Sequence, residues 1–483
     1  MRDFRSILNI IGLLLCIEAL AMLIPMFTDL LYHNQDWEKF FFSSLITFFI
    51  GLVLYFSFKK EKVKIKIRQA FVLTILSWII IAIFSSLPFV FTTTNLDYTD
   101  AFFESISGIT TTGATVLSNL DNLPEGILIW RSLLQWFGGI GIIVLAMAIL
   151  PTLQIGGMQL LHMEQDDPYE KTLPKINQFV IEIFSLYLFL TAICGFLYYY
   201  FGMDGFDAVA HAMTTISTGG FSTHNLSIGN FNSVSIETIS VIFMIIGSLP
   251  FVVYLKFIHG DRSSLFNDDQ IKLFAFIVLI LIGLTTIWLQ KSSLNQNLLY
   301  SFRLSIFNIT SILTGTGYTS TNYNTWGSFG LVIMIIIMFI GGCAGSTTGG
   351  IKIFRLQLLF RGAKTQIKKL TQPHGVFLTS FNGKSVTEDA FNSIMGFFFM
   401  YIFIFVLASM ALSFYNLDFL TAFSAAAAAI SNVGPGLGSI IGPSSNYSSL
   451  PNGAKWILSL TMLVGRLELF TFLVLISISF WKK

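Results

Sequence analysis

Long apolar stretches alternate with short polar segments along the whole chain. The apolar stretches lie near residues 6–31, 39–58, 69–92, 127–150, 178–202, 234–258, 271–290, 327–360, 391–415 and 455–481. A helix needs about 20 mainly apolar residues to cross the hydrocarbon core of a bilayer. The pattern therefore predicts about ten spans and an all-α polytopic membrane protein.

The polar connections differ in charge. Segment 59–68 and the segment after the eighth span are rich in Lys and Arg, whereas segments 93–126, 203–232, 292–326 and 416–453 together contain one basic residue, Arg303, and three of the four contain acidic residues. Because short cytoplasmic loops retain positive charge, we expect the basic connections and both termini in the cytoplasm. The four segments poor in Lys and Arg are then expected outside.

Each outer segment has the same order of features: a short apolar helix, a turn rich in Thr, Ser and Gly, and a polar return. The turns are TTTGAT at 110–115, STGGFS at 217–222, TGTGYT at 314–319 and SNVGPG at 431–436. Candidate caps for the preceding helices are Asp100, Asp207, Asn297 or Ser301, and Asp418. This internal repeat predicts four membrane-pore-membrane units around a central pore, after an extra N-terminal helix pair.

Four such turns are typical of an ion pathway. A cation that enters a membrane loses its water, and rings of backbone carbonyls replace that water. Pointing consecutive carbonyls at one axis requires left-handed backbone, which glycine adopts most easily. One glycine-rich turn alone is more often a surface loop. The candidate filter residues are Thr111, Thr112, Gly113, Thr218, Gly219, Gly220, Gly315, Thr316, Gly317, Asn432, Val433 and Gly434.

The eighth apolar stretch contains GGCAGSTTGG at 341–350, which is too rich in glycine for a regular helix. It is not a P-loop, because Ile351 and Lys352 stand where Lys and Ser or Thr are required. One interpretation is a kink packed between helices. The other, which we favour, is an intramembrane loop below the turns that obstructs the pore. Its candidate hinges are Gly341, Gly342, Gly345, Gly349 and Gly350.

Arg466 lies near the middle of the last stretch, with Glu468 close by. A charge at this depth costs about 2.5–3.5 kcal/mol, so it needs a partner or a wet cavity. Two interpretations stay open: an ion pair with Glu468 or another helix, and an electrostatic barrier in the permeation path. His211 and His224 flank the second turn, where they are candidates to tune it.

With the strings GGCAGSTTGGIK and GRLELF, these features resemble the Trk, Ktr and HKT cation transporter superfamily, and within it the bacterial TrkH family, over the whole chain. The resemblance implies potassium uptake through a gated, channel-like subunit of the bacterial inner membrane. It implies K⁺ as the transported ion, a homodimer, and a cytoplasmic ring of nucleotide-binding TrkA-type subunits that carries the nucleotide control.

The same resemblance bears on selectivity. In the family, four filter glycines go with potassium, and serine at the first position goes with sodium in some plant members; this chain has Gly113. The fourth turn departs from the others through Asn432, Val433 and Pro435. This implies weaker selectivity than that of a four-fold symmetric channel.

The predicted organisation is an N-terminal helix pair at 1–68 and pore repeats at 69–177, 178–270, 271–387 and 388–483. The inner segments 151–177 and 361–390 are expected to form interfacial helices or a docking surface. A coupled symporter that uses protons or sodium is the alternative function, although inverted repeats would mark it, whereas these four share one orientation.

Composition narrows the other classes. The chain has 54% hydrophobic and 11% charged residues, whereas soluble domains carry about 25% charged residues. Its net charge of +2 is scattered, which argues against a nucleic-acid partner. Cys16, Cys194 and Cys343 are too far apart for a disulfide framework or a metal site. The sequence contains no recognisable acid, base or nucleotide motif, so we expect neither an enzyme nor an organic cofactor.

Overall fold

The computed structural model describes residues 4–59, 67–145, 175–292 and 297–481, and its regular structure is almost entirely helical. In these ranges the one sheet is the hairpin of β1 (Ser380–Phe381) and β2 (Lys384–Ser385). The same residues include seven helices long and apolar enough to cross a membrane, or nine spans if two bent helix pairs are counted. The predicted all-α polytopic fold is confirmed.

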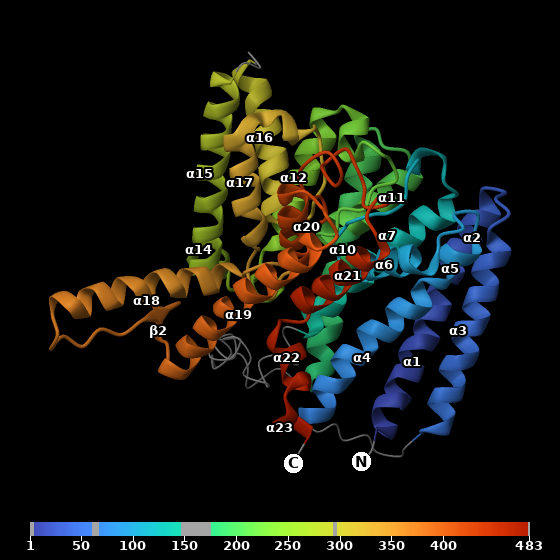
Figure 1. Ribbon diagram of the computed structural model, residues 1–483, viewed down its shortest axis with the longest axis horizontal. Coiled ribbons are helices and arrows are strands. Elements are labelled where there is room, and N and C mark those ends of the chain that lie inside the picture. Colours follow the sequence, from blue (N-terminus) through green and yellow to red (C-terminus); the bar gives the residue numbers. More distant parts are fainter. Residues whose placement is uncertain (1–3, 60–66, 146–174, 293–296, 482–483) are drawn as a thin grey trace.

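An N-terminal pair precedes the repeats. It consists of α1 (Arg5–Ala21) with its continuation α2 (Leu23–Leu31), and α3 (Trp37–Ser57). The helices α1 and α3 approach closely because glycines face each other: a Cβ on Gly12 would lie 2.7 Å from the carbonyl oxygen of Gly51. In Figure 1 the pair flanks the molecule on the side opposite α15 and α17. The ends of the described chain lie on one side of the molecule.

Four units of similar order follow, each with a short pore helix between longer helices. The first contains α4 (Ile67–Ser85), α5 (Leu87–Phe91), pore helix α6 (Tyr98–Ile109), η1 (Leu120–Asn122) and α7 (Glu125–Val144). The second contains α10 (Lys175–Tyr200), pore helix α11 (Gly205–Ile216), η4 (Ser227–Phe231), α12 (Val234–Ser248) and α13 (Phe251–Ile258). The repeat boundaries given above remain predictions.

The third unit contains α14 (Ser264–Asn267), α15 (Asp269–Lys291), pore helix α16 (Leu298–Leu313), η5 (Tyr323–Trp326), α17 (Gly327–Phe339) and α18 (Ile353–Thr371). The fourth contains α19 (Glu388–Ser413), pore helix α20 (Phe419–Ser431), α21 (Asn452–Arg466), α22 (Phe470–Ile476) and α23 (Ile478–Trp481). Figure 1 shows α18 extending sideways from the body, with the β-hairpin beside it.

Three predicted spans are sharply bent or interrupted. Span 234–258 bends by 90° between α12 and α13, where Pro250 lacks the N–H that a helix interior requires. Span 455–481 bends by 112° between α21 and α22, because Glu468 and Leu469 have positive φ. Span 327–360 ends its first helix at Phe339, since its glycine-rich part bonds to other segments instead.

The predicted helix caps are partly wrong. Asp418 caps α20 and Asn297 caps α16, which confirms two of the predicted caps. The caps of α6 and α11 are Asp97 and Asp204, which accept hydrogen bonds from the backbone N–H groups of Asp100 and Asp207. Sequence alone did not distinguish the two acidic residues, which stand three apart in both segments. Ser301 lies inside α16.

Of the two expected interfacial segments, 361–390 forms the end of α18 and the hairpin, and it exposes Ile367, Leu370, Val376 and Leu378. The other, 151–177, lies outside the described residues except for the first residues of α10.

Candidate ion-conduction site

All four pore helices end in the same way. The N–H groups of Thr112, Gly219, Thr316 and Val433 each donate to a carbonyl five residues earlier, on Ser107, Thr214, Ser311 and Ala428 respectively. This is the six-to-one bond of a Schellman motif, which needs a left-handed residue just before the donor. The left-handed residues are Thr111, Thr218, Gly315 and Asn432. The four turns therefore share one backbone structure, although their sequences differ.

Threonine in this conformation is costly. Thr111 has φ 52° and Thr218 has φ 49°, and such a backbone costs about 1–3 kcal/mol in a β-branched residue. The strain is sustained because the surroundings are fully packed: Thr111 and Thr218 are each 1% exposed. Two residues after each left-handed position the chain turns left-handed again, at Gly113, Gly220, Gly317 and Gly434.

These four glycines close a ring around one axis. A Cβ on Gly113 would lie 2.2 Å from the carbonyl oxygen of Gly219, and one on Gly220 would lie 1.8 Å from that of Thr316. A Cβ on Gly317 would lie 2.1 Å from the Val433 oxygen, and one on Gly434 would lie 2.6 Å from the Thr112 oxygen. Each repeat thus contacts the next, and the fourth contacts the first. Only glycine fits at these contacts.

The ring surrounds a small cavity of about 80 Å³ that all four glycines line. Of the twelve candidate filter residues, Gly219 and Gly434 have carbonyl oxygens that accept hydrogen bonds, from Gln135 Nε2 and the Tyr447 hydroxyl. In the described chain the other carbonyl oxygens of these residues accept none. Buried carbonyls are nearly always paired, so a set of free ones in four adjoining turns is suited to bind a cation.

Side chains behind the turns hold them in place. Gln135 of α7 donates to the Gly219 oxygen at 2.6 Å and accepts from the Phe221 N–H at 2.9 Å. The amide of Asn432 links the fourth turn to the first, through a 2.9 Å bond to the Thr112 hydroxyl. Tyr318 of the third turn bonds to the hydroxyls of Thr214 and Thr215 behind the second turn. The ring is thus braced across repeats.

A buried ion pair that the sequence analysis missed lies beside the ring. Arg131 Nε is 2.8 Å from Glu104 Oε1, with both side chains at most 1% exposed. Arg131 also donates to the Ser222 carbonyl, and its guanidinium packs 4.1 Å from the Phe221 ring centre. The pair ties the first turn to the second. The signal was present, because Arg131 is a charge in a predicted span and needs a partner, as Arg466 does.

The glycine-rich segment 340–352 is a fully packed loop beneath the ring. Its backbone bonds to the second repeat, from Cys343 N to the Ser248 oxygen (2.9 Å) and from Phe251 N to the Gly345 oxygen (3.0 Å). The Thr347 hydroxyl lies 3.0 Å from that of Thr218 in the second turn. On the other side, a Cβ on Gly349 would lie 2.3 Å from the Ser431 oxygen. The loop therefore spans from the second turn to the fourth.

The other candidate hinges lie within this loop. Gly345 and Gly350 have positive φ, 74° and 69°. Gly341 and Gly342 permit close contacts, since a Cβ on either would come within 2.9 Å of a backbone oxygen, on Gly349 and Ser248 respectively.

Arg466 connects the loop to two repeats. Its Nη1 donates to the Thr347 carbonyl at 2.9 Å, and its Nη2 donates to the Gly138 carbonyl at 3.3 Å. The Arg466–Glu468 pair considered above is not formed: Glu468 instead pairs with Arg355 of α18 at 2.6 Å. Arg466, Lys352 and the loop glycines 345, 349 and 350 line one cavity of about 20 Å³. Arg466 is thus a clamp on the loop.

The two histidines differ in environment. His211 is buried, and its ring nitrogens contact the Asp207 carbonyl and the Ser222 hydroxyl, each at 2.9 Å. His224 lies in the loop after the second turn, between two carboxylates, 2.9 Å from Asp207 and 2.7 Å from Asp121. The hydrogen bond to Asp207 raises the pKa of His224 to about 9. Asp121 acts in the same direction, whereas partial burial opposes the rise. His224 thus links the segments that follow the first and second turns.

This link predicts a pH dependence of stability. The pKa of His224 is about 6.5 in the unfolded chain and about 9 in the folded protein. The protonated ring therefore stabilises the folded state fully below pH 6.5, and this stabilisation is lost as the pH rises to 9. The melting temperature of the purified protein should therefore fall across this window. His224→Gln should flatten the fall, whereas His374→Gln, at an exposed site, should not. Parallel curves for the wild type and His224→Gln would contradict the assignment.

Comparison with known proteins agrees with this architecture. The TrkH family, described as cation transport proteins, matches residues 37–482. The Trk system potassium uptake protein TrkI of Halomonas elongata is 38% identical, with 100% of this chain and 98% of that protein covered. TrkH of Escherichia coli K12 is also 38% identical, over 99% and 100%. The crystal structure of the potassium transporter TrkH from Vibrio parahaemolyticus superposes with a TM-score of 0.92 at 37% identity, covering both chains fully.

The fold and the ring of turns define a multi-span membrane transport protein built from membrane-pore-membrane repeats, and not an enzyme. The chain belongs to the TrkH family of cation transport proteins. The family resemblance seen in the sequence is confirmed.

Proposed function

We propose that this protein takes up potassium across the bacterial inner membrane through a gated, channel-like pore. The observation that carries the proposal is the closed ring of four glycine-to-carbonyl contacts, whose turns contain carbonyl oxygens that accept no hydrogen bond from the described residues. Dehydrated K⁺ would be held there by oxygens of the twelve filter residues. The relatives named above are potassium uptake proteins or potassium transporters, which supports K⁺ as the ion.

The loop at 340–352 is the gate in this proposal. It is buried directly beneath the ring and contacts the second and fourth turns. Its glycines allow the backbone to rearrange, and the Arg466 bonds to Thr347 and Gly138 hold it in place. The guanidinium also places a positive charge next to the pathway, which opposes cation passage. Opening would require the loop to leave this packed position.

Family membership and charge distribution support a proposal for the cellular context. We propose a homodimer with both termini in the cytoplasm, bound there by a ring of TrkA-type nucleotide-binding subunits. The Trk system named for the relatives supports association with further components. The ends of the described chain lie on one side of the molecule, as this orientation requires.

Flux in proteoliposomes that contain the purified chain alone tests the proposal. A potassium gradient at fixed pH and voltage should drive passive, potassium-preferring flux, and a sodium gradient should drive less. Flux that depends on an opposing or accompanying proton or sodium gradient would contradict the channel-like mechanism and establish the coupled symporter. The Gly220→Ala variant serves as the negative control.

A substitution at the first turn tests selectivity. Gly113→Ser puts a Cβ within 2.2 Å of the Gly219 oxygen, so the oxygens of the first and second turns must move apart. We expect the potassium-to-sodium flux ratio to fall by about ten-fold, which corresponds to about 1.4 kcal/mol. The measurement is paired potassium and sodium flux in the same vesicles. An unchanged ratio in a folded variant would remove Gly113 from the filter.

A further inference from the structure

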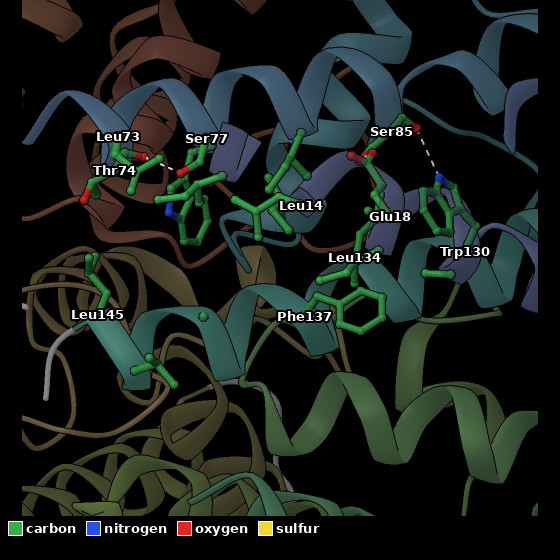
Figure 2. Close-up of a pocket in the computed structure, with 18 residues that line it drawn as sticks. Leu14, Glu18, Leu73, Thr74, Ser77, Ser85, Trp130, Leu134, Phe137 and Leu145 are labelled. Atoms are coloured by element: carbon green, nitrogen blue, oxygen red, sulfur yellow. Dashed lines mark hydrogen bonds between the residues drawn. The ribbon is translucent and has the colours of Figure 1, made fainter. Parts of the chain in front are cut away.

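A cavity outside the ion pathway lies between the N-terminal pair and the first repeat. It has a volume of about 380 Å³ and is bounded by α1, α4 and α7. Figure 2 shows side chains of all three helices pointing into it, among them Leu14, Leu73 and Phe137. This volume is within the range of about 300–1,000 Å³ typical of small-molecule sites. The ion pathway described above does not use it.

One acidic side chain lines this apolar cavity. Glu18 of α1 is 7% exposed, and its Oε1 accepts a 2.5 Å hydrogen bond from the Ser85 hydroxyl. Its Oε2 has no hydrogen-bond partner among the described residues. Two neighbouring polar groups are engaged: Trp130 Nε1 donates to the Ser85 carbonyl, and the Ser77 hydroxyl donates to the Thr74 carbonyl. Among the described lining residues, Glu18 Oε2 is the fully buried side-chain polar atom without a hydrogen-bond partner.

The depth of Glu18 fixes its chemistry. It lies midway along the 27-residue span Arg5–Leu31, and in the described chain no Lys or Arg pairs with it. A lone ionised carboxylate at mid-membrane is very costly, so the neutral acid is the favoured form. Because Ser85 donates to Oε1, the acid proton belongs on Oε2. Glu18 therefore presents an O–H donor without an acceptor.

The cavity lies next to the lipid-facing surface. Ile17 lines it and is 52% exposed, on the face of α1 that also exposes Leu13 and Leu20. A ligand can thus enter from the bilayer. Water fits poorly beside Glu18, because a buried water needs two or more polar partners, and Glu18 Oε2 is the one fully buried side-chain atom of the described lining residues without a partner. A phospholipid fits poorly too, because its polar groups lie at the membrane surface and Glu18 lies at mid-depth.

We propose that this cavity binds a neutral, mainly apolar molecule dissolved in the bilayer, which carries one hydroxyl or carbonyl oxygen that accepts a hydrogen bond from Glu18. The apolar part would fill the space between α1, α4 and α7. Ile109, the last residue of the first pore helix, is also part of the wall, so the ligand would contact the helix that leads into the first turn.

A photoreactive long-chain alcohol, with a diazirine in its alkyl chain, tests the proposal on the full-length protein in liposomes. Mass spectrometry should place the label on cavity residues such as Leu14, Leu73 or Phe137. Unlabelled 1-decanol should compete, and n-decane should compete roughly five-fold less well, as loss of one hydrogen bond predicts. Label spread evenly over lipid-facing residues such as Leu13 and Leu20 would overturn the proposal.

Two variants test the volume of the cavity and the hydrogen bond from Glu18 separately. Gly141→Leu should fill the cavity, because a Cβ there meets its nearest atom, on Trp78, only at 3.8 Å; labelling should fall by about ten-fold. Gly283→Leu on α15 is the matched control, with open space around its Cβ, and should label normally. Glu18→Leu should abolish the advantage of decanol over decane. Unchanged labelling in Gly141→Leu would overturn the assignment. So would an advantage of decanol over decane that is retained in Glu18→Leu. If a variant does not fold, competition on the wild-type protein decides the assignment.

Discussion

Gly220→Ala is expected to abolish potassium-selective flux. Of the four ring glycines, Gly220 makes the closest contact: an added Cβ would lie 1.8 Å from the Thr316 oxygen and 2.8 Å from the Thr316 carbonyl carbon. Its φ of 78° adds backbone strain of about 1–3 kcal/mol for any other residue. Neither cost can be relieved without separating the second and third turns. Potassium flux in proteoliposomes should fall by more than about ten-fold, because strain of this size shifts the equilibrium between the intact and the separated ring by about that factor.

The other end of the same pore helix supplies the control. Gly205 begins α11 with no atom within 4 Å of an added Cβ and without a positive φ, so Gly205→Ala should conduct normally. Gly434→Ala should be less severe than Gly220→Ala, since its nearest contact is 2.6 Å. Normal potassium flux through Gly220→Ala would show that the ring is not the conduction site.

Arg466→Ala is expected to increase flux. The substitution removes both bonds that hold the loop, to the Thr347 and Gly138 carbonyls, and leaves the N-terminal turns of α21 unchanged. Hydrogen bonds from a charged donor contribute about 1.5–3 kcal/mol each. Loss of even one should shift a closed-to-open equilibrium by about ten-fold or more. Initial potassium flux at equal protein density is the measurement.

Further variants distinguish the clamp from the charge. Arg466→Gln retains a hydrogen-bond donor without the charge, so an increase as large as that of Arg466→Ala would identify the charge as the main barrier. Arg262→Ala removes an exposed arginine from the loop before α14 and should leave flux unchanged. Reduced flux in a folded Arg466→Ala protein would show that Arg466 supports conduction instead of opposing it.

The sequence predicted the repeats and the ring positions well because both depend on local backbone chemistry. Glycine adopts left-handed backbone most easily, so Gly113, Gly220, Gly317 and Gly434 could be aligned without a structure. The clustering of glycines at 341–350 likewise indicated that the eighth span is interrupted. These features are encoded within a few adjacent residues.

The partners of buried charges could not be predicted, because they depend on which helices meet. Arg466 and Glu468 are two residues apart, yet they interact with different segments, the loop carbonyl of Thr347 and the side chain of Arg355. The bend begins directly after Arg466, in the stretch Leu467–Leu469, which contains neither proline nor glycine to indicate it. The Arg131–Glu104 pair is likewise formed by two helices whose packing the sequence did not specify.

The ring is built from one chain, which affects how its properties can change. In an assembly of four identical subunits, a single codon alters all four positions of a filter at once. Here one codon alters one quarter of the ring, and the four turns already differ, with Thr, Gly, Thr and Val before their glycines. Ion preference can therefore be adjusted in small, separate steps during evolution, and a mutation that would be lethal four-fold can be tolerated once.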